Sequence, residues 1–330
     1  MNNLDSFVIQ RGSAEIAARE VATKRAKVDS VTLIYVPLFC GGKHRGTLMG
    51  PQAVRVAELS TRLQGMGLKV DREVEIKVPS ALSWKASPQK SPKCVPEILD
   101  TCTELASVVE AALEAGTIPI TIGGDHSLAI GSLAGASAYY RKRNEQFGLV
   151  WFDAHGDINT PETSRSGNVH GMPFAVSLGH GDPRLVNMGG FAPKVEASKS
   201  VLIGIRDLDP DEREMITLSG ITAFSMRDID HMGLVKVSEL AVSSVGPDVS
   251  GLHVSFDIDV MDPDVAPGVS TPSPGGLSFR ESSLALTFLA ETDLVRSIDI
   301  AELNPANDVK NRTAELAVNL AMTCLGSRIL

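Results

Sequence analysis

A short apolar run that ends in a cluster of charged residues constrains this chain more than any other feature. Residues 149–152 (LVWF) form a run typical of a strand buried on both faces of a parallel sheet. The run stops at Asp153, and His155 and Asp157 follow at alternate positions. Alternate side chains of an extended chain point to the same side, so we expect the three groups to converge. A charged turn is the alternative, but turns favour isolated Asp or Asn, whereas this cluster calls for a compensating cation.

Strand-like apolar runs alternate with helical patterns along most of the chain, which is typical of a parallel sheet covered by helices on both faces. Strands are predicted at 31–38, 70–78, 117–122, 149–152, 201–205, 221–225, 252–256 and 294–300. Helices are predicted at 51–66, 94–115, 234–244, 278–291 and 309–325, with two more that end near residues 140 and 219. The sequence therefore predicts one α/β domain over residues 31–330. An extension of residues 1–30, with an amphipathic helix at about 13–27, precedes it.

Composition excludes several classes of protein. The chain has 330 residues, 43% of them hydrophobic, which is enough for a large core. A net charge of −9 without a Lys/Arg cluster argues against a nucleic-acid partner. No apolar run reaches the roughly 18 residues of a membrane span, and a secretory signal is missing. Four cysteines without CxxC pairing indicate reduced thiols and a cytoplasmic protein, with an intermolecular disulfide left open.

Other strand-like runs also end in polar or ionisable residues. The carboxyl ends of parallel strands meet at one edge of a sheet, so these residues are expected to gather there. Each one alone is a weak signal, because a lone His before a helix is often a cap and Asp-x-Asp is often a turn. Together they supply a specific constellation: His126, Asp153, His155, Asp157, Asp209, Asp257, Asp259 and Glu302.

Charge arithmetic indicates what such a site would hold. Four of these carboxylates, those of Asp153, Asp157, Asp257 and Asp259, carry four negative charges, which two divalent cations would balance. Oxygen-rich ligation with two imidazoles and no thiolate suits octahedral Mn²⁺, with Fe²⁺, Co²⁺ or Ni²⁺ as alternatives. Two ions roughly 3.5–4 Å apart can lower the pKa of a shared water to near neutral. The expected chemistry is metal-assisted hydrolysis.

Three segments carry a resemblance to a known superfamily. GGDHS at 123–127, DAHGD at 153–157 and SFDIDVMDPDVAPG at 255–268 resemble the metal-binding signatures of the ureohydrolases: arginases, agmatinases and formiminoglutamases. The resemblance covers about residues 31–328 and implies a three-layer α/β/α fold with a mostly parallel sheet. It also implies two Mn²⁺ per chain. One would be held by His126, Asp153, Asp157 and Asp257, and the other by His155, Asp153, Asp257 and Asp259.

The loop after the central strand distinguishes one ureohydrolase from another. DINTP at 157–161 and SGNVHGMP at 166–173 are similar to the arginase pattern. This similarity implies that Asn159, Ser166 and Asn168 bind the α-carboxylate of an amino acid. The α-ammonium would bind to Asp209 with support from Glu212, and Thr271 would line the pocket near the guanidinium. A formiminoglutamase would be expected to use a basic residue instead, for which Arg165 is the nearby candidate, and an agmatinase should not need this polar loop.

The same resemblance implies catalytic roles for Asp157, His170 and Glu302. His170 would be the proton shuttle, since an imidazole titrates near neutral pH. Glu302 would pair with the substrate guanidinium, and Asp157 would both bind metal and accept a proton. The predicted function is therefore a manganese-dependent arginase of arginine metabolism and the urea cycle, which converts L-arginine to L-ornithine and urea. A surface role for Glu302 and a helix-start role for His170 are the structural alternatives.

Three other functions compete with this prediction. The first is another ureohydrolase, a formiminoglutamase or an agmatinase. The second is a catalytically silent arginase-like binding protein, although every expected ligand position holds a competent residue. The third, a nucleotide-binding Rossmann protein, lacks the GxGxxG order. For assembly, the resemblance implies a homotrimer or a hexamer of two trimers.

Overall fold

The computed structural model describes residues 29–78 and 92–327. Its centre is an eight-stranded sheet in the order β2-β1-β3-β8-β7-β4-β5-β6, and every neighbouring pair of strands is parallel. The strands are β1 (Ser30–Val36), β2 (Lys69–Glu75), β3 (Ile118–Gly123), β4 (Gln146–Phe152), β5 (Ser200–Ile205), β6 (Thr222–Ser225), β7 (Val249–Asp257) and β8 (Val295–Ala301). The predicted α/β fold is confirmed, with a fully parallel sheet.

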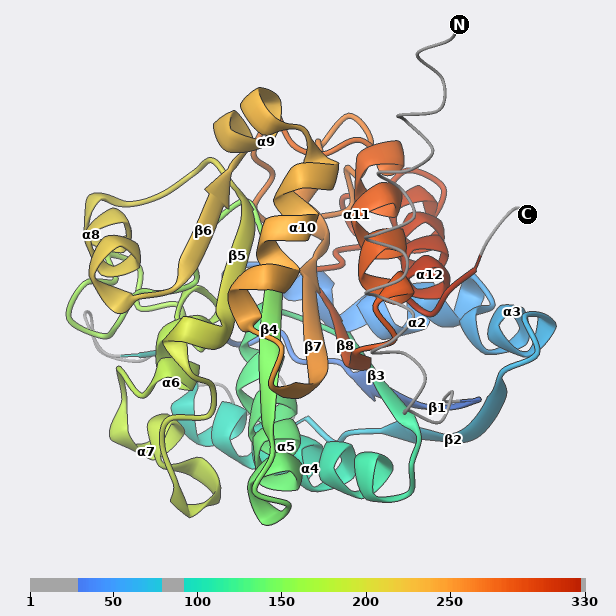
Figure 1. Ribbon diagram of the computed structural model, residues 1–330, viewed down its shortest axis with the longest axis horizontal. Coiled ribbons are helices and arrows are strands. Elements are labelled where there is room, and N and C mark those ends of the chain that lie inside the picture. The colour runs from blue at the N-terminus through green and yellow to red at the C-terminus, as the bar shows by residue number, and fades with distance from the viewer. Residues whose placement is uncertain (1–28, 79–91, 328–330) are drawn as a thin grey trace, which may run out of the picture.

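Helices cover both faces of the sheet and give the α/β/α layers seen in Figure 1. One face carries α2 (Gly50–Val56), α3 (Leu59–Gly65), α9 (Met226–Met232), α10 (Leu234–Val245), α11 (Phe279–Glu291) and α12 (Arg312–Cys324). The other carries α4 (Val95–Glu114), α5 (Ala129–Lys142), α6 (Pro173–Leu178) and α7 (Pro183–Val186). Helix α8 (Pro210–Ser219) lies beside β6. Short 3₁₀ helices lie in the connections: η1 (Arg45–Met49), η3 (His126–Leu128), η4 (Val169–Gly171), η5 (Met188–Gly190), η6 (Ala197–Lys199) and η7 (Ile258–Val260).

The alternation of side chains along each strand divides the core into two layers. In β4, Val150 and Phe152 join the apolar cluster under α10 and α11, whereas Leu149 and Trp151 join the cluster under α5. All four side chains are buried because helices cover both faces. This explains why the strand reads as a continuous apolar run in the sequence.

The order of the strands decides which loops meet. Strands β3 and β4 follow one another in the chain, but β8 and β7 lie between them in the sheet. The carboxyl ends of β3, β8, β7 and β4 are therefore neighbours, although their residues are far apart in sequence. The segments that follow these four strands begin at residues 124, 302, 258 and 153, so the fold brings all the predicted site motifs to one edge.

Some predicted elements differ from the structure. The helix predicted at 51–66 is two helices, because Glu58 adopts a left-handed backbone (φ 61°) between α2 and α3. Helix α9 was not predicted; its seven residues are too few for a clear helical period, and it begins with a capping box at Ser225 and Asp228. The helix predicted at 13–27 and most of the loop predicted at 79–93 lie outside the described residues.

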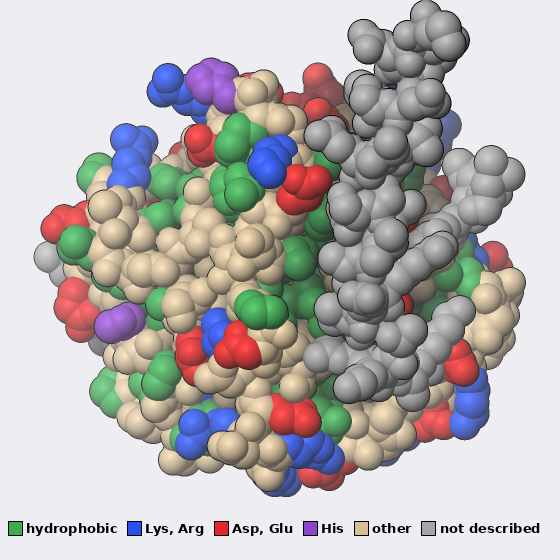
Figure 2. Space-filling view, viewed as in Figure 1, with side chains coloured by type: hydrophobic (Ala, Val, Ile, Leu, Met, Phe, Trp, Pro, Cys, Tyr) green, Lys and Arg blue, Asp and Glu red, His purple; other side chains and the backbone are tan. Residues whose placement is uncertain are grey.

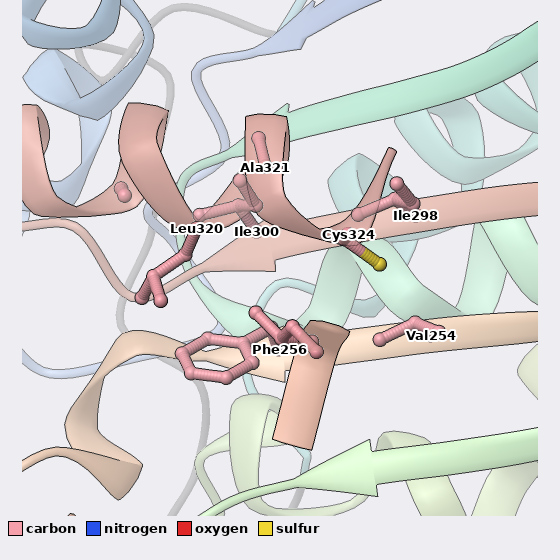
Figure 3. Close-up of a pocket in the computed structure, with 9 residues that line it drawn as sticks. Val254, Phe256, Ile298, Ile300, Leu320, Ala321 and Cys324 are labelled. Carbon is pink, nitrogen blue, oxygen red and sulfur yellow. The ribbon is translucent and has the colours of Figure 1, made fainter. Parts of the chain in front are cut away.

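Buried contacts rather than surface charge pairs hold the layers together. Figure 3 shows apolar side chains of β7, β8 and α12 around a cavity of about 10 Å³ whose lining is entirely apolar. By contrast, charged side chains of both signs are scattered over the face drawn in Figure 2. Lys236 and Glu239 on α10 form one such exposed pair, at 3.1 Å, and pairs of this kind contribute little to stability.

No helix within residues 29–78 and 92–327 is long and apolar enough to cross a membrane.

The loop that follows β3 depends on a close backbone approach at Gly124. A Cβ atom on this residue would lie 1.9 Å from the carbonyl oxygen of Leu38, in the segment after β1. We expect Gly124→Ala to lower the free energy of unfolding by about 3 kcal/mol, because backbone on both sides must shift. Denaturant titration of metal-free protein measures this.

Gly65 provides the matched control for this substitution. It lies in α3, and nothing lies within 4 Å of the position of its Cβ. Gly65→Ala should leave the free energy of unfolding unchanged or raise it by up to about 1 kcal/mol. Equal losses from the two substitutions would show that close packing at Gly124 is not the cause.

Candidate metal centre

The first group of candidate ligands surrounds the imidazole of His126, in η3 directly after β3. Its Nδ1 atom lies 3.4 Å from Asp153 Oδ2, 3.1 Å from Asp157 Oδ2 and 3.0 Å from Asp257 Oδ2. All four side chains are buried. One imidazole nitrogen thus faces three carboxylate oxygens, an arrangement whose negative charge exceeds what a single histidine can compensate.

The second group surrounds His155 and shares Asp153 with the first. The His155 Nδ1 atom lies 3.3 Å from Asp153 Oδ1 and 3.2 Å from Asp259 Oδ2. The two oxygens of Asp153 therefore face different imidazoles, and Asp153 joins the groups. The structure brings together all six side chains from β3, β4 and β7 that the sequence singled out as metal ligands.

The expectation that residues 153–157 converge because they stay extended is wrong. Residues 153–157 do not continue as an extended strand, because β4 ends at Phe152 and Asp157 adopts a left-handed backbone (φ 48°). The turn sends Asp157 to the His126 group and His155 to the other group. Glu302 is also left-handed (φ 62°), directly after β8. Non-glycine residues in this conformation are strained and are enriched at functional sites.

Neighbouring side chains orient the candidate ligands. Trp151 Nε1 donates to Asp153 Oδ2 at 2.9 Å, and the indole stacks on the His126 ring with centroids 4.1 Å apart. Ser255 Oγ lies 2.9 Å from His126 Nε2, so that Nδ1 is the nitrogen turned to the carboxylates. Thr271, which is predicted to line the substrate pocket, donates to Asp259 Oδ2 at 2.9 Å. Partners of this kind fix the geometry of metal ligands.

The two remaining predicted catalytic residues contact each other. His170 Nδ1 lies 2.9 Å from Glu302 Oε1, which also accepts the backbone N–H of His126 at 2.9 Å. Glu302 Oε2 is buried and has no hydrogen-bond partner within the described residues. Asp125 holds the nearby glycine loop by accepting the backbone N–H groups of Gly41 and Gly42. His170 and Glu302 thus form one unit beside the His126 group.

The predicted substrate-binding residues lie in two segments beside this centre. Asn159 is buried, Asn168 is half-buried and Ser166 is exposed, all in the loop between β4 and η4. Asp209 begins α8 in a capping box with Glu212, which is buried. Arg165 links the segments, since its Nε lies 3.8 Å from Asp209 Oδ1. The position of a Cβ on Gly156, next to Asp157, lies 3.0 Å from Glu212 Oε1, which places Glu212 against the ligand loop.

Without metal, several acidic and basic side chains of the site have raised pKa values and therefore keep their protons to a higher pH than usual. Burial raises the pKa of Asp157, and the charge of Asp153 adds to it, giving about 7. Burial and the charges of Asp259 and Asp153 raise the pKa of Asp257 well above its usual value. Burial alone would lower the pKa of His170, but the carboxylate of Glu302 outweighs it and the pKa rises to about 9. Cations that bind at this site would displace these protons.

An α/β/α fold with two linked groups of carboxylates and imidazoles at the strand ends is typical of a metal-binding enzyme. Residues 29–326 match the model of the arginase family. An arginase from Brevibacillus brevis is 41% identical over 301 residues, covering 91% of this chain and 99% of that protein. The chain belongs to the arginase family.

Solved structures agree with this assignment. A 1.7 Å crystal structure of arginase from Bacillus subtilis superposes with a TM-score of 0.85 at 41% identity and covers 92% of this chain and 100% of that one. An Entamoeba histolytica arginase in complex with L-ornithine has a TM-score of 0.82 at 30% identity, with coverage of 92% and 100%. The predicted membership of the ureohydrolase superfamily is confirmed.

We expect the metal-free protein to lose stability as pH rises from 5 to 9. Asp157, Asp257 and His170 have raised pKa values in the folded state, so the folded protein binds more protons than the unfolded chain, and the stability this gives is lost as those protons leave. Asp153 has a lowered pKa, but its opposing effect is complete above about pH 4. The melting temperature should fall by about 5 °C or more.

Scanning calorimetry of chelator-treated protein checks this expectation. The same scan with added divalent cation should show a much flatter dependence on pH, since the cation replaces the protons. Asp157→Asn removes one titrating group and should reduce the slope in the metal-free protein. A melting temperature that rises between pH 5 and 9 without metal would contradict the raised pKa values of Asp157, Asp257 and His170.

Proposed function

We propose that this protein is an arginase, which hydrolyses the guanidinium group of L-arginine to give L-ornithine and urea. The observation that carries the proposal is the pair of buried ligand groups joined by Asp153 in a chain of the arginase family. The relatives at about 40% identity are named arginases, and one more distant structure holds L-ornithine. The polar loop at 159–168 supports an amino-acid substrate over its decarboxylated analogue.

His126, Asp153, Asp157 and Asp257 would hold one divalent cation. His155, Asp153 and Asp259 would hold the second, with Asp257 as a further shared ligand. The fit is supported by Asp157 Oδ2, which is buried and accepts no hydrogen bond within the described residues. We propose Mn²⁺, because the donor set is rich in oxygen, contains two imidazoles and lacks a thiolate. When bound, the pair supplies Lewis acidity that lowers the pKa of a water molecule.

The residues of the chain would then orient the substrate and move protons. Glu302 Oε1 is already occupied by His126 and His170, which leaves the buried Oε2 to pair with the substrate guanidinium. Asp157 would also take the proton of the attacking water. His170 binds Glu302 through Nδ1, so its Nε2 is the atom left to donate a proton to the departing amine.

The far end of the substrate would meet the two loop segments. Asn159, Ser166 and Asn168 would bind the α-carboxylate, while Asp209 with Glu212 would bind the α-ammonium. Thr271 would act indirectly, through its hydrogen bond to Asp259. In this arrangement the reacting carbon lies over the ligand groups, and the amino-acid end lies between the β4–η4 loop and the start of α8.

Replacing the proton donor should abolish most turnover without disturbing the metals. We expect His170→Asn to lower kcat for urea release from L-arginine by about 100-fold or more, since that is a typical contribution of general acid–base catalysis. His180→Asn makes the same change at an exposed histidine and should keep kcat unchanged. Asp157→Ala should lose both bound metal and activity. Metal analysis and a urea assay on Mn²⁺-loaded protein measure these effects.

Three substrates separate the proposal from its alternatives. The parent protein should release urea from L-arginine far faster than from agmatine. Comparable rates with agmatine would overturn the substrate assignment and leave the metal site intact. Formamide from formiminoglutamate would indicate a formiminoglutamase. Protein that holds metal but acts on none of these substrates would be a silent binding protein.

The oligomeric state, the cellular location and the metabolic pathway of the protein stay predictions. A homotrimer would have a mass of three times the 35.0 kDa chain, and a hexamer twice that mass. Light scattering on the purified protein distinguishes the two from a monomer. A cytoplasmic location is predicted from the four cysteines without CxxC pairing, and a place in the urea cycle from the resemblance.

A further inference from the structure

In the loop proposed to bind the α-carboxylate, the amide oxygens of Asn159 and Asn168 already accept hydrogen bonds from other residues of the protein. Thr163 Oγ1 donates to Asn159 Oδ1 at 2.8 Å, while its own oxygen accepts the backbone N–H of Thr160 at 2.9 Å. Lys93 Nζ donates to Asn168 Oδ1 at 2.7 Å. An asparagine amide has one accepting oxygen and a donating NH₂ group. Because both oxygens are engaged, both amides are left to present their NH₂ groups.

Ser166 completes the same pattern. Its Oγ accepts the backbone N–H of Asn168 at 3.2 Å, which leaves the hydroxyl proton free to donate. A carboxylate can only accept hydrogen bonds. Asn159, Ser166 and Asn168 therefore all offer hydrogen-bond donors. Such a group of donors is complementary to a carboxylate and poorly suited to a neutral amide or an alkyl end.

Lys93 differs from the other partners because it is a cation and has no accepting atom. It can support Asn168 in one orientation of the amide alone, with Oδ1 toward the ammonium. Its backbone N–H also donates to Gly167 O at 3.0 Å, which fixes its position against the loop. Arg165, a cation within this loop, has a side chain that is 70% exposed and faces Asp209 instead. Lys93 is thus the positive charge in direct contact with a predicted carboxylate-binding side chain.

We propose that Lys93 determines specificity for substrates with a free α-carboxylate. It acts as a positioning residue that turns the NH₂ group of Asn168 toward the carboxylate, and its charge favours the anion over decarboxylated or amidated analogues. The inference rests on the proposed function, since it concerns the carboxylate end of the same substrate. In the sequence, Arg165 is the basic residue nearest this pattern, and no local signal links Lys93 to it.

Steady-state kinetics with three substrates test this role. L-arginine carries the carboxylate, L-argininamide replaces it by a neutral group, and agmatine lacks it. We expect Lys93→Met to raise KM for L-arginine roughly tenfold, as for the loss of one charge-assisted hydrogen bond, with kcat within about twofold of the parent. KM for the other two substrates should stay unchanged. Where agmatine turnover is too slow, its Ki as a competitive inhibitor serves.

Two further substitutions at this position sharpen the test. Lys93→Arg keeps a cation without an acceptor and should restore most of the affinity for L-arginine. Lys93→Glu would accept from the Asn168 NH₂ group, reverse the amide and add a negative charge. It should therefore weaken L-arginine binding more than Lys93→Met does, and it should increase the preference for agmatine.

Thr163→Val tests the orientation argument apart from charge. It removes the donor to Asn159 Oδ1 and should raise KM for L-arginine more than KM for agmatine, by a smaller factor than Lys93→Met. Lys236→Met removes a lysine that pairs with Glu239 on the exposed face of α10 and is the control for net charge. It should change none of the three KM values.

Two outcomes would overturn the role of Lys93. Unchanged KM for L-arginine in Lys93→Met would do so, and so would an equal rise for all three substrates, because that indicates a general loop effect. The failure of the proposed function looks different. It would appear in the parent protein, as an absence of urea release from L-arginine with both metals bound.

Discussion

Repulsion between buried carboxylates is the constraint on which this structure depends. Asp153, Asp157 and Asp257 all approach one imidazole nitrogen within 3.4 Å, and all three side chains are buried. Ionised groups at this spacing are stable only with compensating positive charge, which protons supply at low pH and divalent cations supply when bound. Stability and metal binding are thus linked through the same side chains, and neither can be changed at this site without the other.

The sheet supplies the rigidity that such a site requires. Strands β8 and β7 lie between β3 and β4, so the segments that carry the candidate metal ligands and Glu302 start from four adjacent, buried strands. Strained backbone can then be maintained at the strand ends. The carbonyl of Asp157 accepts the backbone N–H of Phe174 at 2.9 Å, and the N–H of Glu302 donates to Gly124 O at 2.8 Å. These bonds hold both left-handed residues in place.

Sequence predicts the parts of this structure that depend on local pattern. Buried parallel strands are continuous apolar runs, and the residues that end them are chemically conspicuous, so the sheet and the ligand side chains follow from reading the chain. The left-handed turn at Asp157 does not, because an aspartate gives no clear signal for it. The contact of Lys93 with Asn168 spans 75 positions and depends on where α4 begins, which no local pattern encodes. The hydrogen bond of Thr271 to Asp259, a candidate metal ligand, is likewise a contact that no local pattern encodes.

The site thus separates two tasks by the kind of element that performs each. Groups that would bind metal lie at or next to strand ends, and the proposed proton donor His170 is held against one of them through Glu302. A shift of one of these side chains would displace several others. Groups that would bind the amino-acid end lie mainly on loops held by single side-chain hydrogen bonds, one of them local, from Thr163, and one from a distant part of the chain, from Lys93. Substitution in these loops can turn an amide or change a charge without moving the ligands. A family that keeps one hydrolytic centre and varies its substrates would be expected to vary at such positions.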